Sequence, residues 1–167
     1  MQKVITIFSV FFLGLVIFSC KKPSSPDPGP PVIAYKSFDI VNKNDAYLHF
    51  TFTVPDGDIG LNPYDDTATS SPYHYDFHSR FQLKNYQGNF IDSVWVDITG
   101  ADSAQYNYRI PFVENKSKDK SLTGEIIVYL NGYRPANIYK RFRYTIYIYD
   151  RAHHKSNIIT TPELYYP

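Results

Sequence analysis

The sequence predicts an all-β fold, an antiparallel β-sandwich of seven to nine strands, and three observations predict it. Aromatic residues make up 17% of the 167 residues, and 16 of them are tyrosines. Turn residues recur at intervals, and no stretch sustains a hydrophobic period of 3.6 residues. Residues 47–54 and 141–149 alternate between apolar and polar side chains, as half-buried strands do. Short strands separated by frequent turns are typical of a sandwich.

Six further strands are expected from runs of β-branched and aromatic residues. They lie at 32–41, 77–86, 90–98, 106–113, 122–130 and 157–161. The sequence YQGN at 86–89 has the composition of a hairpin turn, and the charged run at 114–121 has that of a solvated loop. Trp95 is out of phase with its neighbours, so we expect it to cover the second face of its sheet.

The first 19 residues have the pattern of a secretion signal. Lys3 precedes a predominantly apolar run over 4–18, and the small residue Ser19 precedes Cys20. The run is shorter than the roughly 20 residues that a membrane-spanning helix needs, and proline-rich sequence follows it. We therefore expect cleavage just before Cys20, which leaves 148 residues, enough for one hydrophobic core.

The sequence IFSC at 17–20 resembles the lipobox of bacterial lipoproteins, in which the cysteine is acylated and becomes the new amino terminus. Cys20 is the only cysteine, it ends the apolar run, and Lys21 and Lys22 follow it. The resemblance implies a chain that lipid anchors to a bacterial outer membrane, on a face that the sequence does not specify. The alternative is an ordinary signal peptide in which Cys20 is incidental.

Residues 21–31 contain five prolines and no apolar side chain to bury, so they should form an extended tether. In a polyproline conformation such a tether reaches about 30 Å. The folded domain is therefore expected over 32–167. The leader contains one of the 17 basic residues and none of the 16 acidic ones, so the mature chain is formally neutral. Neutrality argues against a nucleic-acid partner.

The sequence IYDRAHHKSNIITTPEL at 148–164 resembles the closing hairpin of bacterial immunoglobulin-like domains, in which a strand ends in a D-x-A turn and the next begins near S-N. His153 and His154 stand where those domains usually have Gly-Asn, and we expect both to be exposed. The layout of lipobox, short tether, one DGDIG loop and this ending is similar to small lipoproteins of unknown function common in Bacteroidota. The resemblance implies an immunoglobulin-like sandwich and no catalytic residues.

Asp56 and Asp58 of the DGDIG sequence have the spacing of the carboxylates that begin many calcium loops. The loop is not an EF-hand, because Gly60 stands at the third acidic position and no glutamate closes it. In an immunoglobulin-like sandwich the loop after the second strand and the closing hairpin lie at the same end. Asp150 and Asn157 are therefore expected beside the pair, in a two-loop oxygen site for Ca²⁺.

A structural turn explains the same residues without an ion. Asp caps backbone N–H groups and Gly accepts a positive φ, and Asp150 would then cap the closing hairpin or pair with Arg151. Further oxygens are available at Asn62, Asp65 and Asp66. The first strand of such a sandwich begins at this same end, so the tether should enter there. A calcium site would then brace the base of the anchor.

His74, Asp76 and His78 would share one face if residues 74–78 form a strand. Two imidazoles and a carboxylate so arranged suit zinc or another transition metal, and they would support a metal-dependent hydrolase. The alternative is an ordinary strand with a polar outer face, whose core face would carry Tyr75, Phe77, Phe81 and Leu83.

Tyr147 and Tyr149 are expected to share an outward face with Arg141 and Arg143. Exposed rings beside polar groups stack on sugars or peptides, although tyrosine also covers sheet surfaces simply as a strong strand former. No G-x-S-x-G, H-E-x-x-H or Gly-rich phosphate loop occurs, so no enzymatic activity is predicted. The sequence predicts a binding or structural module, with Ca²⁺ as candidate cofactor and a protein or glycan as candidate partner.

Overall fold

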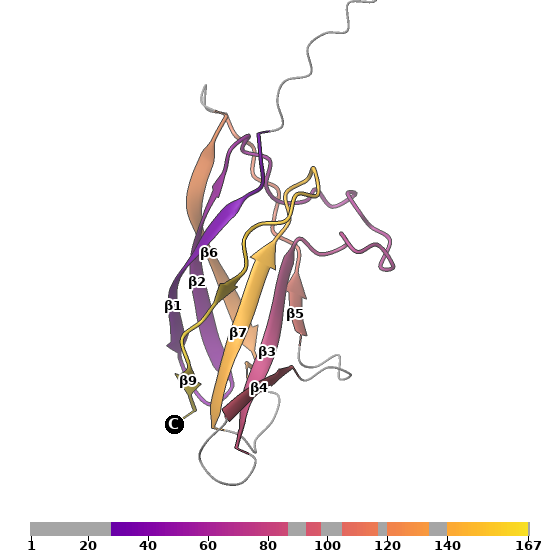
Figure 1. The fold of residues 1–167 in the computed structure, drawn as a ribbon. Coiled ribbons are helices and arrows are strands. Elements are labelled where there is room, and N and C mark those ends of the chain that lie inside the picture. The colour runs from indigo at the N-terminus through magenta and orange to yellow at the C-terminus, as the bar shows by residue number, and fades with distance from the viewer. Residues whose placement is uncertain (1–27, 87–92, 98–104, 117–119, 134–139, 167) are drawn as a thin grey trace, which may run out of the picture.

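Two antiparallel sheets pack face to face in a computed structural model of the chain (Figure 1). The structure describes residues 28–86, 93–97, 105–116, 120–133 and 140–166. Within these ranges there are nine strands and no helix, so the predicted all-β sandwich is confirmed. Nothing in the same ranges is a helix long and apolar enough to cross a bilayer.

The smaller sheet has three strands in the order β1-β2-β6. Their bounds are β1 Val32–Ile40, β2 Asp45–Val54 and β6 Leu122–Asn131. A β-bulge interrupts β1 between Tyr35 and Ser37. The pairing of β2 with β6, in contrast, runs through ten residue pairs without a register shift.

The larger sheet has six strands, in the order β4-β3-β7-β8 with β5 beside β3 and β9 beside β7. The bounds are β3 Phe77–Tyr86, β4 Ser93–Asp97, β5 Gln105–Tyr108, β7 Arg141–Ile148, β8 Ile159–Thr160 and β9 Leu164–Tyr165. β4 and β5 pair with successive parts of β3, and β8 and β9 pair with successive parts of β7. Each edge of this sheet is therefore built from short strands.

The strand bounds differ from the expected ones in three places. The strand expected over 106–113 ends at Tyr108, because Arg109 binds a loop and Pro111 has no N–H to donate to a sheet. The strand expected over 157–161 shortens to β8, and β9 was not expected. Of the strand expected over 90–98, only β4 is described, and the turn expected at 86–89 lies almost wholly outside the described residues.

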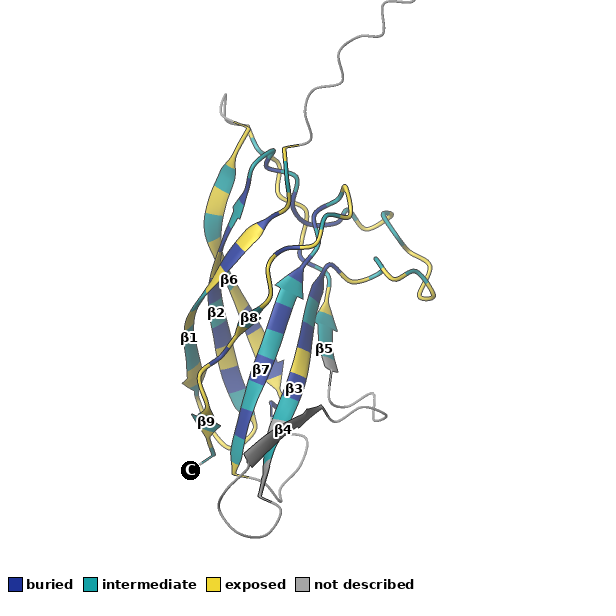
Figure 2. Cartoon of the chain, viewed as in Figure 1, coloured by how far each residue is buried: buried dark blue, intermediate teal, exposed yellow. Residues whose placement is uncertain are grey.

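The inward side chains of β2 and β7 make up much of the core, and Figure 2 shows the alternation of buried and less buried residues along β7. Both alternations predicted from the sequence are confirmed. The buried residues of these two strands are Ala46, Leu48, Phe50, Phe52 and Val54 of β2 and Phe142, Tyr144, Ile146 and Ile148 of β7. The rings of Phe50 and Phe77 stack across the two sheets with centroids 5.8 Å apart. Each such side chain contributes about 1.5–3 kcal/mol on burial.

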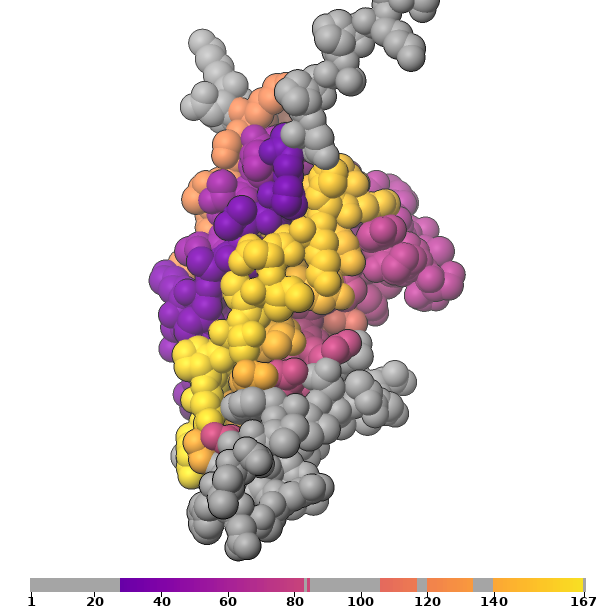
Figure 3. Space-filling model, in the orientation of Figure 1, coloured from indigo at the N-terminus to yellow at the C-terminus, as the bar shows by residue number. Residues whose placement is uncertain are grey.

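The C-terminal segment closes one side of the sandwich. Figure 3 shows it, in yellow, lying against the indigo N-terminal strand. Asn157 makes the contact, since its Oδ1 accepts the N–H of Ile33 at 2.8 Å and its Nδ2 donates to the carbonyl of Ile33 at 2.9 Å. An amide side chain offers one donor and one acceptor, as a peptide group does. Asn157 thus supplies the hydrogen bonds that a neighbouring strand would give to Ile33.

Candidate functional site

Two loops meet at the end of the sandwich where β1 begins (Figure 1). The first covers residues 55–76 between β2 and β3, and the second follows β7 over 149–155. Arg151 joins them, because its backbone N–H donates to the carbonyl of Asp58 at 3.2 Å and its guanidinium pairs with the Asp58 carboxylate. The structure therefore brings the DGDIG loop and the closing hairpin together.

The DGDIG loop has the geometry of a tight turn. Asp56 Oδ1 accepts the N–H of Asp58 at 3.1 Å, which is the hydrogen bond of an Asx turn. Gly60 has a φ of 79°, and a Cβ atom at this position would overlap the carbonyl group of Pro111. Ile59 is fully buried and pins the loop into the core. Turn chemistry and packing thus account for these residues.

Asp150 caps the turn of the closing hairpin. Its buried carboxylate accepts the N–H of His154 at 2.7 Å and lies 2.9 Å from His154 Nδ1. Burial raises the pKa of Asp150 above its ordinary value, and the hydrogen bonds from His154 oppose that effect. The side-chain partner of Asp150 is therefore His154 and not Arg151, which binds Asp58 instead. His154 is correspondingly half-buried, whereas the sequence predicted exposure.

All four predicted calcium ligands are engaged by protein groups: Asp56 by the N–H of Asp58, Asp58 by Arg151, Asp150 by His154 and Asn157 by Ile33. Among the described residues there is no group of three or more His, Cys, Asp or Glu side chains arranged to hold a metal ion. A calcium ion between the loops would have to displace protein partners. The calcium site stays a prediction of the sequence alone.

Calcium is accordingly expected to leave the melting temperature unchanged within about 1 °C, because a ligand stabilises the folded state only where it binds that state. The measurement is a thermal melt of the full chain with calcium, with zinc and with excess chelator. If calcium raised the melting temperature of the wild type but not that of an Asp58→Asn variant, the result would support the predicted calcium site between the two loops.

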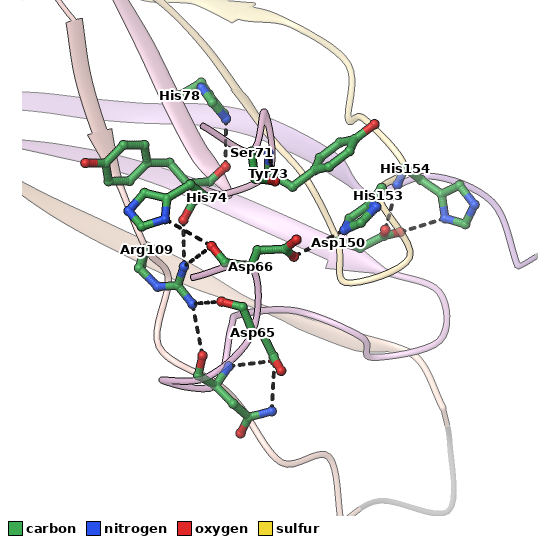
Figure 4. A network of polar contacts seen from close by, with 12 residues as sticks. Asp65, Asp66, Ser71, Tyr73, His74, His78, Arg109, Asp150, His153 and His154 are labelled. Atoms are coloured by element: carbon green, nitrogen blue, oxygen red, sulfur yellow. Dashed lines mark hydrogen bonds and ion pairs between the residues drawn. The ribbon is translucent and has the colours of Figure 1, made fainter. Parts of the chain in front are cut away.

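Arg109 anchors the long loop before β3 (Figure 4). Its Nη1 donates to the carbonyls of His74 at 2.7 Å and Asp66 at 3.4 Å. Its Nη2 donates to the carbonyls of Asn62 at 2.9 Å and Asp65 at 2.7 Å. One guanidinium thus donates hydrogen bonds to four backbone carbonyls of the loop, between Asn62 and His74. Sequence reasoning missed Arg109, because carbonyl partners leave no trace in the pattern of side chains.

A small polar cavity of about 280 Å³ lies between the two loops, lined by Leu61, Asp65, Asp66 and Arg151. Its carboxylates already have partners. Asp65 accepts the N–H of Asn62 at 2.9 Å, and this hydrogen bond is the main cause of its lowered pKa. Asp66 Oδ2 lies 3.3 Å from a ring nitrogen of His153 in the second loop. The side chains that line this cavity therefore hold the two loops together, and their carboxylates are not open to a ligand.

Residues 74–78 do not form one strand, so the condition under which His74, Asp76 and His78 would share a face is not met. β3 begins at Phe77, so the first two precede the strand. His74 Nδ1 faces the carbonyl of Asp66 at 3.0 Å, while Asp76 turns into the core. His78 Nε2 faces the carbonyl of Tyr75 at 2.8 Å. The three side chains do not converge on a shared position.

Asp76 also contradicts the alternative of a polar outer face, because it is 2% exposed whereas Tyr75 is 38% exposed. Asp76 Oδ1 accepts the N–H of Ile110 at 2.6 Å. Its Oδ2 is buried and has no hydrogen-bond partner among the described residues. Burial raises the pKa of Asp76 to about 6, against the opposing effect of the Ile110 N–H. Phe77 and Phe81 do face the core, and the side chain of Leu83 lies outside the described ones.

Tyr147 and Tyr149 share the outer face of β7 with Arg141 and Arg143, as their alternation with buried residues predicts. Arg143 Nε donates to Gln82 Oε1 at 2.6 Å, and Arg141 pairs with Glu163. The two arginines of this face thus bind side chains on either side of β7, Gln82 of β3 and Glu163 just before β9.

The ring of Tyr147 is covered on both faces. His78, its cross-strand partner on β3, stacks on it with centroids 4.8 Å apart and planes 9° apart. Lys155 comes from the other side of β7, and its Nζ lies 3.8 Å from the ring centroid. A sugar could stack on Tyr147 only after displacing one of these two residues.

Tyr149 belongs to a second set of rings, which fastens both loops to the sheet. Tyr73 of the first loop stacks on His153 of the second, with centroids 3.7 Å apart. Tyr73 also meets Tyr149 edge to face at 5.2 Å. Such pairs contribute about 0.5–1.5 kcal/mol beyond the burial of their area. The aromatic residues that suggested a sugar platform therefore pack mainly against each other.

An apolar groove of about 570 Å³ lies between β6 and residues 108–113. Its walls include Phe52, Ile110, Val113, Ile126 and Val128. Residues 110–113 stay apart from β6 because they bind the DGDIG loop, with the N–H of Leu61 donating to Ile110 at 2.9 Å and that of Val113 to Ile59 at 3.4 Å. The sequence does not reveal this groove, since it depends on which segment pairs with which.

Protein-family models, curated proteins and solved structures were all compared with the chain, and none of them matches it.

Proposed function

We propose that the chain is an exported lipoprotein, anchored through Cys20, whose immunoglobulin-like sandwich acts as a non-catalytic binding module. The observation that carries the binding role is the groove beside β6. Its volume of about 570 Å³ lies in the range of 300–1,000 Å³ that is usual for ligand pockets, and its walls are predominantly apolar. No other function class has a comparable feature among the described residues.

The immunoglobulin-like assignment is supported by the order of the strands. The first strand pairs with the second and the second with the sixth, while the third pairs with the seventh and the seventh with the closing strands. Constant-type immunoglobulin domains pair their strands in this manner. Tyr144 of β7 adds support, because its hydroxyl donates to the carbonyl of Tyr133 upstream, as the tyrosine of a tyrosine corner does.

The anchor is supported by the lipobox-like IFSC sequence and the lone Cys20. β1 begins at the end that carries the two loops, so the tether joins the domain there (Figure 1). The groove runs along the flank of the sandwich, between β6 and residues 108–113. An occupant could therefore reach the groove while the loop end faces the membrane.

The glycan-binding face at Tyr147 and Tyr149 and the hydrolase built on His74, Asp76 and His78 are the weaker alternatives. Stacking on Tyr147 requires the loss of its contact with His78 or Lys155. The hydrolase lacks converging ligands among its three residues. Within the described part of the chain, neither alternative has a cavity beside its residues that compares with the groove.

Both halves of the proposal are tested on the full chain expressed in a bacterium. A Cys20→Ala variant is expected to lose acyl labelling and membrane fractionation. An apolar fluorescent dye should bind the native protein, and Val113→Lys should abolish that binding, because Val113 lines the groove and is 39% exposed. Val41→Lys is the matched control, at an apolar position that is 59% exposed and away from the groove. Equal dye binding by both variants contradicts the groove, and unchanged fractionation contradicts the anchor.

A further inference from the structure

The edges of the two sheets differ in how they are protected. An unpaired edge strand offers its N–H and C=O groups to other chains, and natural proteins protect such edges with bulges, short strands or covering segments. The outer edge of β1 has a bulge between Tyr35 and Ser37, and Asn157 occupies the peptide groups of Ile33. The edge strands of the larger sheet are short, with five residues in β4, four in β5 and two each in β8 and β9.

β6 is the exception among the described strands. It has ten residues, pairs with β2 in unbroken register, and no described strand pairs with its other side. Ile127 and Tyr129 on it are 57% and 47% exposed. β6 also lacks the lysines and prolines that commonly protect an edge. A long, regular and apolar edge of this kind marks a site for strand pairing.

The groove lies directly beside this edge, so a strand added to β6 would have a place for its inward side chains. Ile126 and Val128 of β6 form one wall, and Ile110 and Val113 form the other. The hydrogen bonds of residues 110–113 to the DGDIG loop keep the second wall away from β6. The N–H and C=O groups on the outer edge of β6 thus lie beside an apolar recess.

The charges at the groove define the chemistry of the occupant. Arg109 and Glu125 are its two charged lining residues. Arg109 is held by four carbonyls of the long loop. Glu125 accepts from Lys36 at 2.6 Å and lies 2.8 Å from His49 Nδ1 on the outer face of the sheet. Since both charges are engaged elsewhere, the complementary occupant is uncharged.

We propose that β6 binds an extended, uncharged polypeptide segment as an additional strand, with alternate apolar side chains of that segment in the groove. This inference rests on the proposed binding role of the groove and names its ligand. An acyl chain would fill the same recess but would leave the peptide groups of β6 without partners. A polypeptide strand satisfies both features, because its backbone pairs while every second side chain faces the recess.

The test uses the full chain in lipid nanodiscs and a blocked ten-residue peptide of alternating valine and threonine. A second peptide of the same sequence carries a methyl group on every backbone nitrogen, so it keeps the side chains but cannot pair. The unmodified peptide is expected to bind, and the methylated one to bind at least about tenfold more weakly. Ile127→Lys should weaken binding of the unmodified peptide about tenfold, because a lysine on an edge strand opposes pairing. Val32→Lys is the matched control, since Val32 is equally exposed at 57% and lies on the other outer strand of the same sheet.

Each remaining outcome overturns the inference. Equal binding of the two peptides, or binding of dodecanol without the peptide, means an apolar pocket without strand pairing and leaves the proposed function intact. A dimer that Ile127→Lys dissociates, with no peptide binding, means that a second copy occupies the edge. If neither peptide nor dodecanol binds and no dimer forms, the binding role of the groove fails as well.

Discussion

An Arg109→Met variant is expected to lose about 3 kcal/mol of unfolding free energy. Methionine keeps the apolar stem but removes the donors that four carbonyls of the long loop accept. A hydrogen bond to a charged group contributes about 1.5–3 kcal/mol, and a partly buried carbonyl left without a partner adds a penalty. The expected loss is smaller than the sum of four such contributions, since water can bind some of these carbonyls in the variant. Urea denaturation of the two proteins at neutral pH gives the difference.

Arg143→Met is the matched control, because Arg143 is half-buried like Arg109 but lies within β7, and its Nε donates to a side chain, that of Gln82. It should cost clearly less than Arg109→Met, about 1.5 kcal/mol, which is the lower end of the contribution of a hydrogen bond to a charged group. Limited proteolysis should in addition cut the Arg109 variant between Asn62 and His74, the two ends of the segment that the guanidinium holds. Equal stability of the two variants would mean that the loop is held by its ring contacts instead.

An Asp76→Asn variant is expected to lose a pH dependence of stability that the wild type shows between about pH 4 and pH 7. The pKa of Asp76 is raised from 3.8 to about 6 by burial, so the folded protein holds this proton more tightly than the unfolded chain does. Its contribution is complete below the unfolded pKa and disappears as the pH rises through the folded pKa. The difference between these two pKa values corresponds to about 3 kcal/mol.

Asparagine resembles the protonated acid, because its Oδ1 still accepts the N–H of Ile110 and its amide replaces the unpartnered Oδ2. The variant should therefore equal or exceed the wild type in stability at pH 7. The pKa of Asp150 is raised as well, so the difference between the two proteins, and not the wild-type curve alone, isolates Asp76. Denaturation midpoints at several pH values between 4 and 7 provide the measurement. Parallel curves for the two proteins would contradict a raised pKa at Asp76.

The sheets could be predicted from the sequence because their signal is local. The alternation in β2 and β7 follows from the two-residue period of a strand, and both predicted core faces are the observed ones. The contact between the DGDIG loop and the closing hairpin also follows from the expected strand order, and Arg151 makes it. Local pattern and topology together were sufficient for these features.

The polar details could not be predicted, because they depend on contacts between residues distant in the chain. Asp76 looks like an outward residue in alternation with Phe77, yet the N–H of Ile110, 34 residues away, makes its burial tolerable. Asn157 has the composition of a calcium ligand, but its amide binds the backbone of Ile33. Tyr147 looks like a sugar platform until Lys155 and His78 are placed on its two faces. In each case the environment of the side chain is set by a contact with a residue that the local sequence pattern does not identify.

The groove escaped prediction for a further reason. It exists because residues 110–113 bind the DGDIG loop, whereas the sequence predicts a strand that continues to residue 113. Gly60 permits this contact, since a Cβ atom at this position would overlap the carbonyl group of Pro111. The open edge therefore follows from a packing detail that no local pattern contains.

Amide hydrogen exchange of the free protein tests the open edge most directly. β2 is paired on both sides, so its amides should be protected throughout. β6 is paired on one side, so we predict that alternate amides of Leu122–Asn131, those that point away from β2, exchange at least about a hundredfold faster than the amides of β2. Protection of all β6 amides at the level of β2 would contradict this prediction, because it would mean that the edge is already covered and that no strand can be added there.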